Sequence, residues 1–161
     1  MPLRNFLLAI HVVGAIFIFG PTVAYAFIGA KAKKEGAPVA WALELVDFID
    51  ARWVTPLSLT LQPASGAWLI VQSKGLWDPF KAQNRWLLAA IILYIVLTVF
   101  TLGFMTPWGK KAHRLAAANQ FGPEFGGLMA KIERGGQVMT VGLLSIIVLM
   151  VVKPGSGFIH Q

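Results

Sequence analysis

Four stretches of the chain are almost entirely apolar and long enough to cross a bilayer. A transmembrane helix needs roughly 20 mostly apolar residues to span about 30 Å of hydrocarbon. The stretches cover residues 5–30, 53–71, 86–106 and 137–152, the last being short. Tryptophans favour the membrane–water interface and lie at or just beyond these boundaries, at Trp53, Trp77, Trp86 and Trp108. The pattern predicts an all-α integral membrane protein, a four-helix bundle.

Two of the connecting segments have helical patterns of their own. Residues 38–52 have helical periodicity with two carboxylates on one face, which is typical of a short interfacial helix or of a cytoplasmic extension of the second span. Residues 110–120 form a basic amphipathic segment. The Gly-Pro-Glu sequence at 122–124 is a start signal for another short helix, which we expect to end at the glycine pair 135–136. Short interfacial helices are therefore predicted in the cytoplasmic loops.

Composition agrees with a single membrane domain over residues 1–161. The chain is 57% hydrophobic and 13% charged, whereas soluble domains carry about 25% charged residues. It has no cysteine, which excludes disulfides, thiolate metal sites and iron–sulfur clusters. Nine of its 14 lysines and arginines lie in the first and third loops, which predicts that these loops are cytoplasmic and both termini extracytoplasmic. The net charge of +7 then indicates attraction to anionic lipid and not to nucleic acid.

One histidine, His11, lies inside the first apolar stretch. An ionisable side chain in hydrocarbon is costly, so it is a functional-site candidate. His11 shares a helix face with Gly14 and Ala15, and small residues one turn away allow a neighbouring helix or a flat cofactor to approach closely. Further along, Gly20 and Pro21 predict a kink.

The second stretch carries a polar stripe at helical spacing, made of Thr55, Ser58, Gln62 and Ser65. Polar groups in hydrocarbon need hydrogen-bond partners, so we expect the stripe to face the interior of the bundle or a wet cavity.

The estimated depth in the membrane is similar for several of these side chains. At about 1.5 Å per residue, His11 lies about 9 Å below the outer end of its helix. The same level falls near Ser65 in the second stretch and near Tyr94 in the third, with Met150 close by in the fourth. The sequence thus predicts a site toward the outer leaflet that comprises His11, Ser65, Gln62, Tyr94 and Met150.

Three roles for His11 follow. In the first, its ring bonds to Ser65, Gln62 or Tyr94 and holds two helices together. In the second, it is an axial ligand of haem b, with Met150 or His11 of a second protomer as the other ligand and Gly14 giving the ring room. In the third, it belongs to a proton or metal-ion route. Copper is disfavoured because the five methionines form no cluster, and no carboxylate lies inside a predicted span.

The opening FLLAIHVVGAIFIFG, residues 6–20, resembles the first helix of a family of small bacterial predicted integral membrane proteins of unknown function. Arg52-Trp53, Ser65-Gly66 and the ending at residues 152–155 fit the same pattern. More distantly, the layout is similar to the copper-resistance D membrane domain and to the haem-binding protoporphyrinogen oxidase of the HemJ type. The resemblance implies a four-helix bundle in a bacterial inner membrane, with His11 as the position carried over. That oxidase has a tryptophan soon after its histidine and a basic residue in a later helix, which this chain lacks. The resemblance therefore favours a binding protein over an enzyme.

Three functions follow from these observations. The first is a haem- or redox-ligand-binding bundle that uses His11. The second is a structural or accessory subunit of a larger membrane complex with no cofactor of its own. The third is permeation of a small solute or ion along the polar stripe. The partners expected are the lipid bilayer and either a second copy of the chain or a larger complex.

Overall fold

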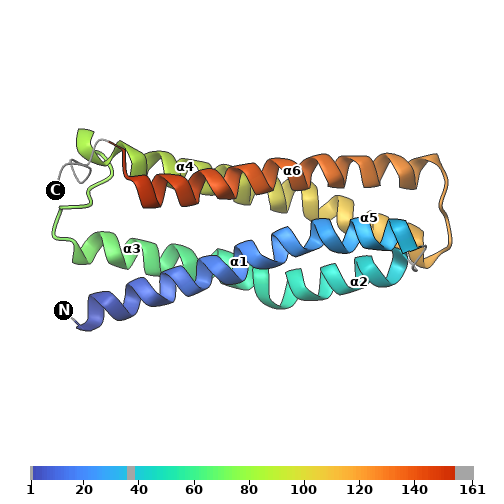
Figure 1. The fold of residues 1–161 in the computed structure, drawn as a ribbon, viewed down its shortest axis with the longest axis horizontal. Helices are drawn as coiled ribbons and strands as arrows, with labels where there is room; N and C mark the ends of the chain where they lie inside the picture. The colour runs from blue at the N-terminus through green and yellow to red at the C-terminus, as the bar shows by residue number, and fades with distance from the viewer. Residues whose placement is uncertain (1, 36–38, 155–161) are drawn as a thin grey trace.

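The computed structural model describes residues 2–35 and 39–154, which form helices joined by turns with no strand among them. Figure 1 shows long helical segments lying side by side. The first is α1 (Pro2–Glu35). The second runs without a break from residue 39 to 72 through α2 (Val39–Ile49), η1 (Asp50–Val54), η2 (Leu57–Leu61) and α3 (Gln62–Gln72). A short turn η3 (Ala82–Asn84) then leads into α4 (Arg85–Phe100), η4 (Thr101–Met105) and α5 (Thr106–Ala117), and the last segment is α6 (Pro123–Val152).

Each helical segment packs against segments that run in the opposite direction. α1 contacts α2 and α3, while α6 contacts α4 and α5 (Figure 1). The two pairs join through contacts of α1 with α6 and of α2 with α5. Glycines allow close approach here: a Cβ on Gly142 of α6 would lie 2.7 Å from Leu97 Cδ1 of α4.

Three π-helical segments share one cause, which is a proline two residues beyond each of them. η1, η2 and η4 precede Pro56, Pro63 and Pro107. A proline in a helix lacks an N–H, and its ring clashes with the carbonyl four residues earlier. That carbonyl lies at the centre of each π segment. In each case the residue before the proline donates its N–H to the carbonyl five residues earlier, as Thr55 does to Asp50. The wider turn thus makes room for the proline.

Within the described residues, three helices are long and apolar enough to cross a membrane: Leu3–Tyr25, Ala82–Ala117 and Pro123–Val152. They contain most or all of the predicted spans 5–30, 86–106 and 137–152. The remaining predicted span, 53–71, lies in the segment that the two π regions divide.

The connecting segments differ from two sequence expectations. Residues 39–52 continue directly into the second span, which is the extension predicted as the alternative to a separate interfacial helix; residue 38 lies outside the described residues. The expected helix end at Gly135 and Gly136 is wrong, because α6 continues through both glycines to Val152. A Cβ on Gly135 would collide with Met105, so this glycine serves helix packing and not helix termination. Likewise α1 is continuous through Pro21.

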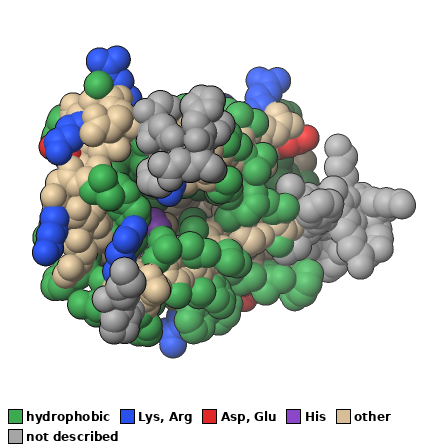
Figure 2. Space-filling model, turned by 60° about the vertical axis from the view of Figure 1, so that its left-hand side comes forward, with side chains coloured by type: hydrophobic (Ala, Val, Ile, Leu, Met, Phe, Trp, Pro, Cys, Tyr) green, Lys and Arg blue, Asp and Glu red, His purple; other side chains and the backbone are tan. Residues whose placement is uncertain are grey.

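One end of the molecule is held by an aromatic ring between two cations. The Arg4 guanidinium carbon lies 5.1 Å from the centroid of the Trp77 ring, and Lys153 Nζ lies 5.6 Å from it. The loop that carries Trp77 is fixed by buried Asn84, which donates to the carbonyls of Leu76 and Asp78 at 2.7 and 2.9 Å. Figure 2 brings this end forward and shows lysines and arginines around the rim and apolar side chains over the sides.

The opposite end has a compact apolar core of its own. Ala112 and Ala116 of α5 are buried against Phe125 and Leu128 of α6, and Leu43 of α2 packs on the same cluster. This cluster lies beyond the predicted spans, where charged residues reappear in α5 and α6. It gives this end of the molecule a fixed shape.

Candidate functional site

His11 of α1 lies against α3, where its ring is bonded on both sides. Its Nδ1 lies 2.9 Å from the hydroxyl of Ser65, and its Nε2 lies 3.3 Å from the amide nitrogen of Gln62. Ser65 is buried, with 5% of its surface exposed. The prediction that the His11 ring bonds to Ser65, Gln62 or Tyr94 is confirmed for Ser65 and Gln62.

The hydrogen-bond directions follow from Ser65. Its hydroxyl has one proton, which it donates to the Leu61 carbonyl at 2.6 Å, with the Gln62 carbonyl 3.2 Å away. Ser65 can then only accept from His11, so Nδ1 carries the ring proton. Nε2 is left with a lone pair, which accepts from the Gln62 amide. The arrangement describes a neutral imidazole with both nitrogens engaged.

Two glycines make room for this arrangement. A Cβ on Gly66 would lie 3.2 Å from Cε1 of His11, so the ring rests on the backbone of α3 at that point. A Cβ on Gly14 would lie 2.8 Å from Oε1 of Gln62, so the amide occupies the space beside α1. Gly14, one of the small residues expected to admit a neighbouring helix or a flat cofactor, here admits the Gln62 side chain of α3.

One polar atom of the network lacks a partner within the described residues. Gln62 Oε1 is buried and accepts no hydrogen bond. Buried carbonyl oxygens are nearly always paired, with protein or with water. This oxygen is therefore where the network has capacity for one more donor.

The polar stripe divides into two parts. Gln62 and Ser65 bond to His11, whereas Thr55 donates to the Asp50 carboxylate at 3.4 Å and Ser58 donates to the carbonyl of Thr55 at 3.0 Å. All four side chains are hydrogen-bonded within the protein, and two of them stay on their own helical segment.

The other predicted site residues lie elsewhere. The Tyr94 hydroxyl donates to the backbone carbonyl of Ser58, joining α4 to η2. Met150 lies near the end of α6, and the structure gives neither residue a bond to His11. The pairing of His11 with Met150 therefore remains a prediction.

The residues present do not fit a haem axial site as they are arranged. A haem iron needs a free imidazole lone pair, and the Nε2 lone pair of His11 faces the Gln62 amide. Nor does any group of three or more His, Cys, Asp or Glu side chains within metal-binding reach occur among the described residues. His11 remains a predicted ligand, and Gln62 would have to move for that role.

Sequence reasoning missed a second polar group, at the other end of the stripe. Asp50 in η1 is partly buried, and burial raises the pKa of its carboxyl group despite the hydrogen bond from Thr55; nearby Asp47 raises it further. The hydroxyl of Tyr25 on α1 is buried, finds no hydrogen-bond partner in the part of the chain that the structure describes, and interacts electrostatically with Asp50. The available signal was a carboxylate three residues before the second apolar stretch.

Comparison with known proteins gives one match. No curated protein and no solved structure matches the chain. The family of predicted integral membrane proteins DUF2269 matches residues 5–154, which is nearly the whole chain and includes every residue of the His11 network. The distant resemblances to the copper-resistance D domain and to the HemJ-type oxidase find no support in this comparison. On this match, together with its apolar helices, the chain belongs to the DUF2269 family of predicted integral membrane proteins.

Proposed function

We propose that this chain is a four-helix membrane protein that serves as a structural or accessory subunit of a larger membrane complex. Residues 53–71 provide the fourth span. They are continuous in helical structure, and their large apolar side chains Trp53, Leu59, Trp68 and Val71 are exposed, as a lipid-facing surface requires. The hydrogen bonds of His11 with Ser65 and Gln62 hold the first two spans together inside the protein.

The observation that supports an accessory role is an exposed face on α2. Trp41 and Phe48 are 59% and 61% exposed, two helical turns apart. The carboxylates of Glu44 and Asp47 are exposed beside them. Large aromatic side chains are common anchors of protein interfaces. Two carboxylates repel anionic lipid, so this face suits a protein partner better than a membrane surface.

Helix length supports a position of that face beyond the hydrocarbon. α6 has 30 residues, which at about 1.5 Å each gives about 45 Å, against about 30 Å of hydrocarbon. The excess lies at the end formed by α2, α5 and the start of α6, where the apolar core is found. A rigid end with an exposed aromatic and acidic face is a suitable docking surface for a partner with basic side chains.

A shallow pocket beside this face would receive such a side chain. Its volume is about 570 Å³. Its lining includes both carboxylates and comprises Glu44, Asp47, Phe48, Ala51, Arg52 and His113.

Native electrophoresis of the protein, extracted from its own membranes in a gentle detergent, tests this proposal. The wild type is expected to migrate in an assembly well above the 17.5 kDa chain. The double variant Trp41→Ala/Phe48→Ala is expected to migrate alone. Ile92→Ala/Val99→Ala removes equally exposed apolar side chains from the lipid-facing part of α4 and should leave the assembly intact. A wild type that migrates as a solitary monomer or dimer would contradict the proposal.

Haem binding is the second candidate, supported by an imidazole inside a membrane span whose Nε2 bond to Gln62 is the longer of its two hydrogen bonds. If Gln62 moves away, Nε2 becomes an axial ligand. A reduced-minus-oxidised visible spectrum of the extracted protein tests it. Haem bands in the wild type that are lost in His11→Ala would support a haem-binding function over a purely structural one, and no bands in either would remove it.

A further inference from the structure

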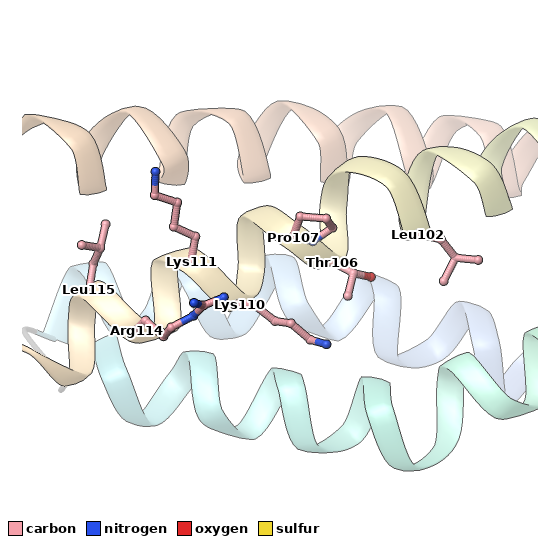
Figure 3. Close-up of a pocket in the computed structure, with 7 residues that line it drawn as sticks. All are labelled: Leu102, Thr106, Pro107, Lys110, Lys111, Arg114 and Leu115. Atoms are coloured by element: carbon pink, nitrogen blue, oxygen red, sulfur yellow. The ribbon is translucent and has the colours of Figure 1, made fainter.

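A shallow groove runs along one face of the η4–α5 segment. Its volume is about 660 Å³. Figure 3 shows the residues that line it, with apolar side chains at both ends and cations between them: Leu102, Thr106, Pro107, Lys110, Lys111, Arg114 and Leu115.

Helical spacing sets two of the three cations side by side. Lys110 and Arg114 are four residues apart, and Thr106 lies one turn before Lys110 on the same face. Lys111 points away from them toward α6, where its Nζ lies 2.5 Å from the Glu124 carboxylate (Figure 3). Among the described residues, the structure gives neither Lys110 nor Arg114 an acidic partner.

The groove extends across the predicted end of the third span, where hydrocarbon gives way to water. Leu102 is 45% exposed and lies in the predicted span, whereas the two cations lie beyond its end at residue 106. Trp108 lies between Leu102 and Lys110 in the sequence, and tryptophan is enriched at the membrane–water interface. Along its length the groove thus changes from apolar to cationic, which matches the change from acyl chain to headgroup in a phospholipid.

We propose that this groove binds an anionic phospholipid from the surrounding leaflet. The headgroup phosphate lies between the Lys110 ammonium and the Arg114 guanidinium, and an acyl chain lies along Leu102. Guanidinium and ammonium groups are suited to phosphate oxygens, and a hydroxyl at Thr106 supplies a third donor. Basic sites on the cytoplasmic side of membrane helices select anionic headgroups in this way.

Native mass spectrometry of the full chain, in detergent with equal amounts of phosphatidylglycerol and phosphatidylcholine, tests the site. The wild type should retain phosphatidylglycerol preferentially. Lys110→Gln/Arg114→Gln should lower the affinity for phosphatidylglycerol about tenfold, and the charge-preserving pair Lys110→Arg/Arg114→Lys should restore most of it. Both side chains are on the surface, so circular dichroism should show unchanged helix content.

A matched variant separates a defined site from general attraction. Lys131→Gln/Arg134→Gln removes one lysine and one arginine from exposed positions on α6, at the same end of the molecule. It should change the affinity less than twofold. Equal losses in the two charge-removing variants would show diffuse electrostatic attraction and overturn the proposal, as would no loss in either. A third measurement adds millimolar inorganic phosphate to the wild type and to Leu102→Ser. If phosphate displaces phosphatidylglycerol equally from both, the site binds phosphate without an acyl-chain contact, and the proposal is overturned.

Discussion

His11 Nδ1 and Ser65 Oγ lie 2.9 Å apart, and this contact joins helix α1 to helix α3. Ser65 also donates to the carbonyl of Leu61, so one hydroxyl satisfies both its own helix and the histidine of the neighbouring helix. The imidazole is neutral in this arrangement because Nε2 accepts from the Gln62 amide, and a neutral ring that is hydrogen-bonded at both nitrogens costs less to bury in hydrocarbon.

Ser65→Ala should lower the free energy of unfolding by about 1–2 kcal/mol, because the buried Nδ1–H of His11 loses its acceptor. Ser145→Ala is the matched control, since Ser145 is partly exposed and, among the described residues, bonds to the Val141 carbonyl of its own helix and not to another helix. Reversible unfolding in mixed micelles measures both changes. Equal effects of the two substitutions would show that the contact between helices contributes nothing.

The tautomer of His11 is a separate prediction. Nitrogen-15 NMR of the imidazole should show Nδ1 protonated and Nε2 unprotonated at neutral pH. The reason is that Ser65 accepts at Nδ1 while the Gln62 amide donates at Nε2. In Gln62→Leu the same tautomer should persist, because the Ser65 contact remains. A spectrum with the proton on Nε2 in the wild type would refute the hydrogen-bond directions assigned here.

Gly66→Ala should displace the His11 ring, because the added methyl group would lie 3.2 Å from Cε1 and 3.7 Å from Nδ1. Alanine raises helix stability by about 1 kcal/mol at a site without neighbours. Gly136→Ala, where nothing lies within 4 Å, should therefore be stabilising. Gly66→Ala should be destabilising by contrast, so that the two variants differ by about 1–2 kcal/mol in the unfolding assay. Matching gains in both variants would mean that the ring has free space.

Asp50 should make stability depend on pH. Burial raises the pKa of its carboxyl group in the folded protein above the ordinary value of 3.8. At a pH between the ordinary pKa and the raised pKa, Asp50 has lost its proton in the unfolded chain but keeps it in the folded protein. Stability should therefore fall as pH rises from about 4 through the raised pKa of Asp50.

Asp50→Asn should remove this dependence on pH, as measured by the unfolding midpoint between pH 4 and pH 8. Glu44→Gln serves as control, because Glu44 is an exposed carboxylate on the adjoining helix α2. If Asp50→Asn leaves the slope unchanged while Glu44→Gln abolishes it, the buried carboxyl group is not the source.

Part of this site could be predicted from the sequence because it depends on position along the chain. Counting residues from the helix ends placed His11 level with Ser65, and the regular spacing of the polar stripe placed Ser65 and Gln62 on one face. The same counting placed Tyr94 and Met150 nearby, but a residue's depth says nothing about the rotation of its helix. The structure directs Tyr94 to the carbonyl of Ser58 instead.

The sequence by itself determined the membrane class and the identity of the polar residues inside its apolar stretches, because hydrocarbon imposes a length and an apolar composition on any helix that crosses it. Only the tertiary structure decided which partners those polar residues find, since that depends on how the helices pack. It also decided that Gly135 and Gly136 lie inside α6. A glycine pair ends a helix when its backbone is exposed, but here Met105 of the neighbouring segment lies against Gly135, and the packing of α6 on α4 and η4 keeps the helix continuous.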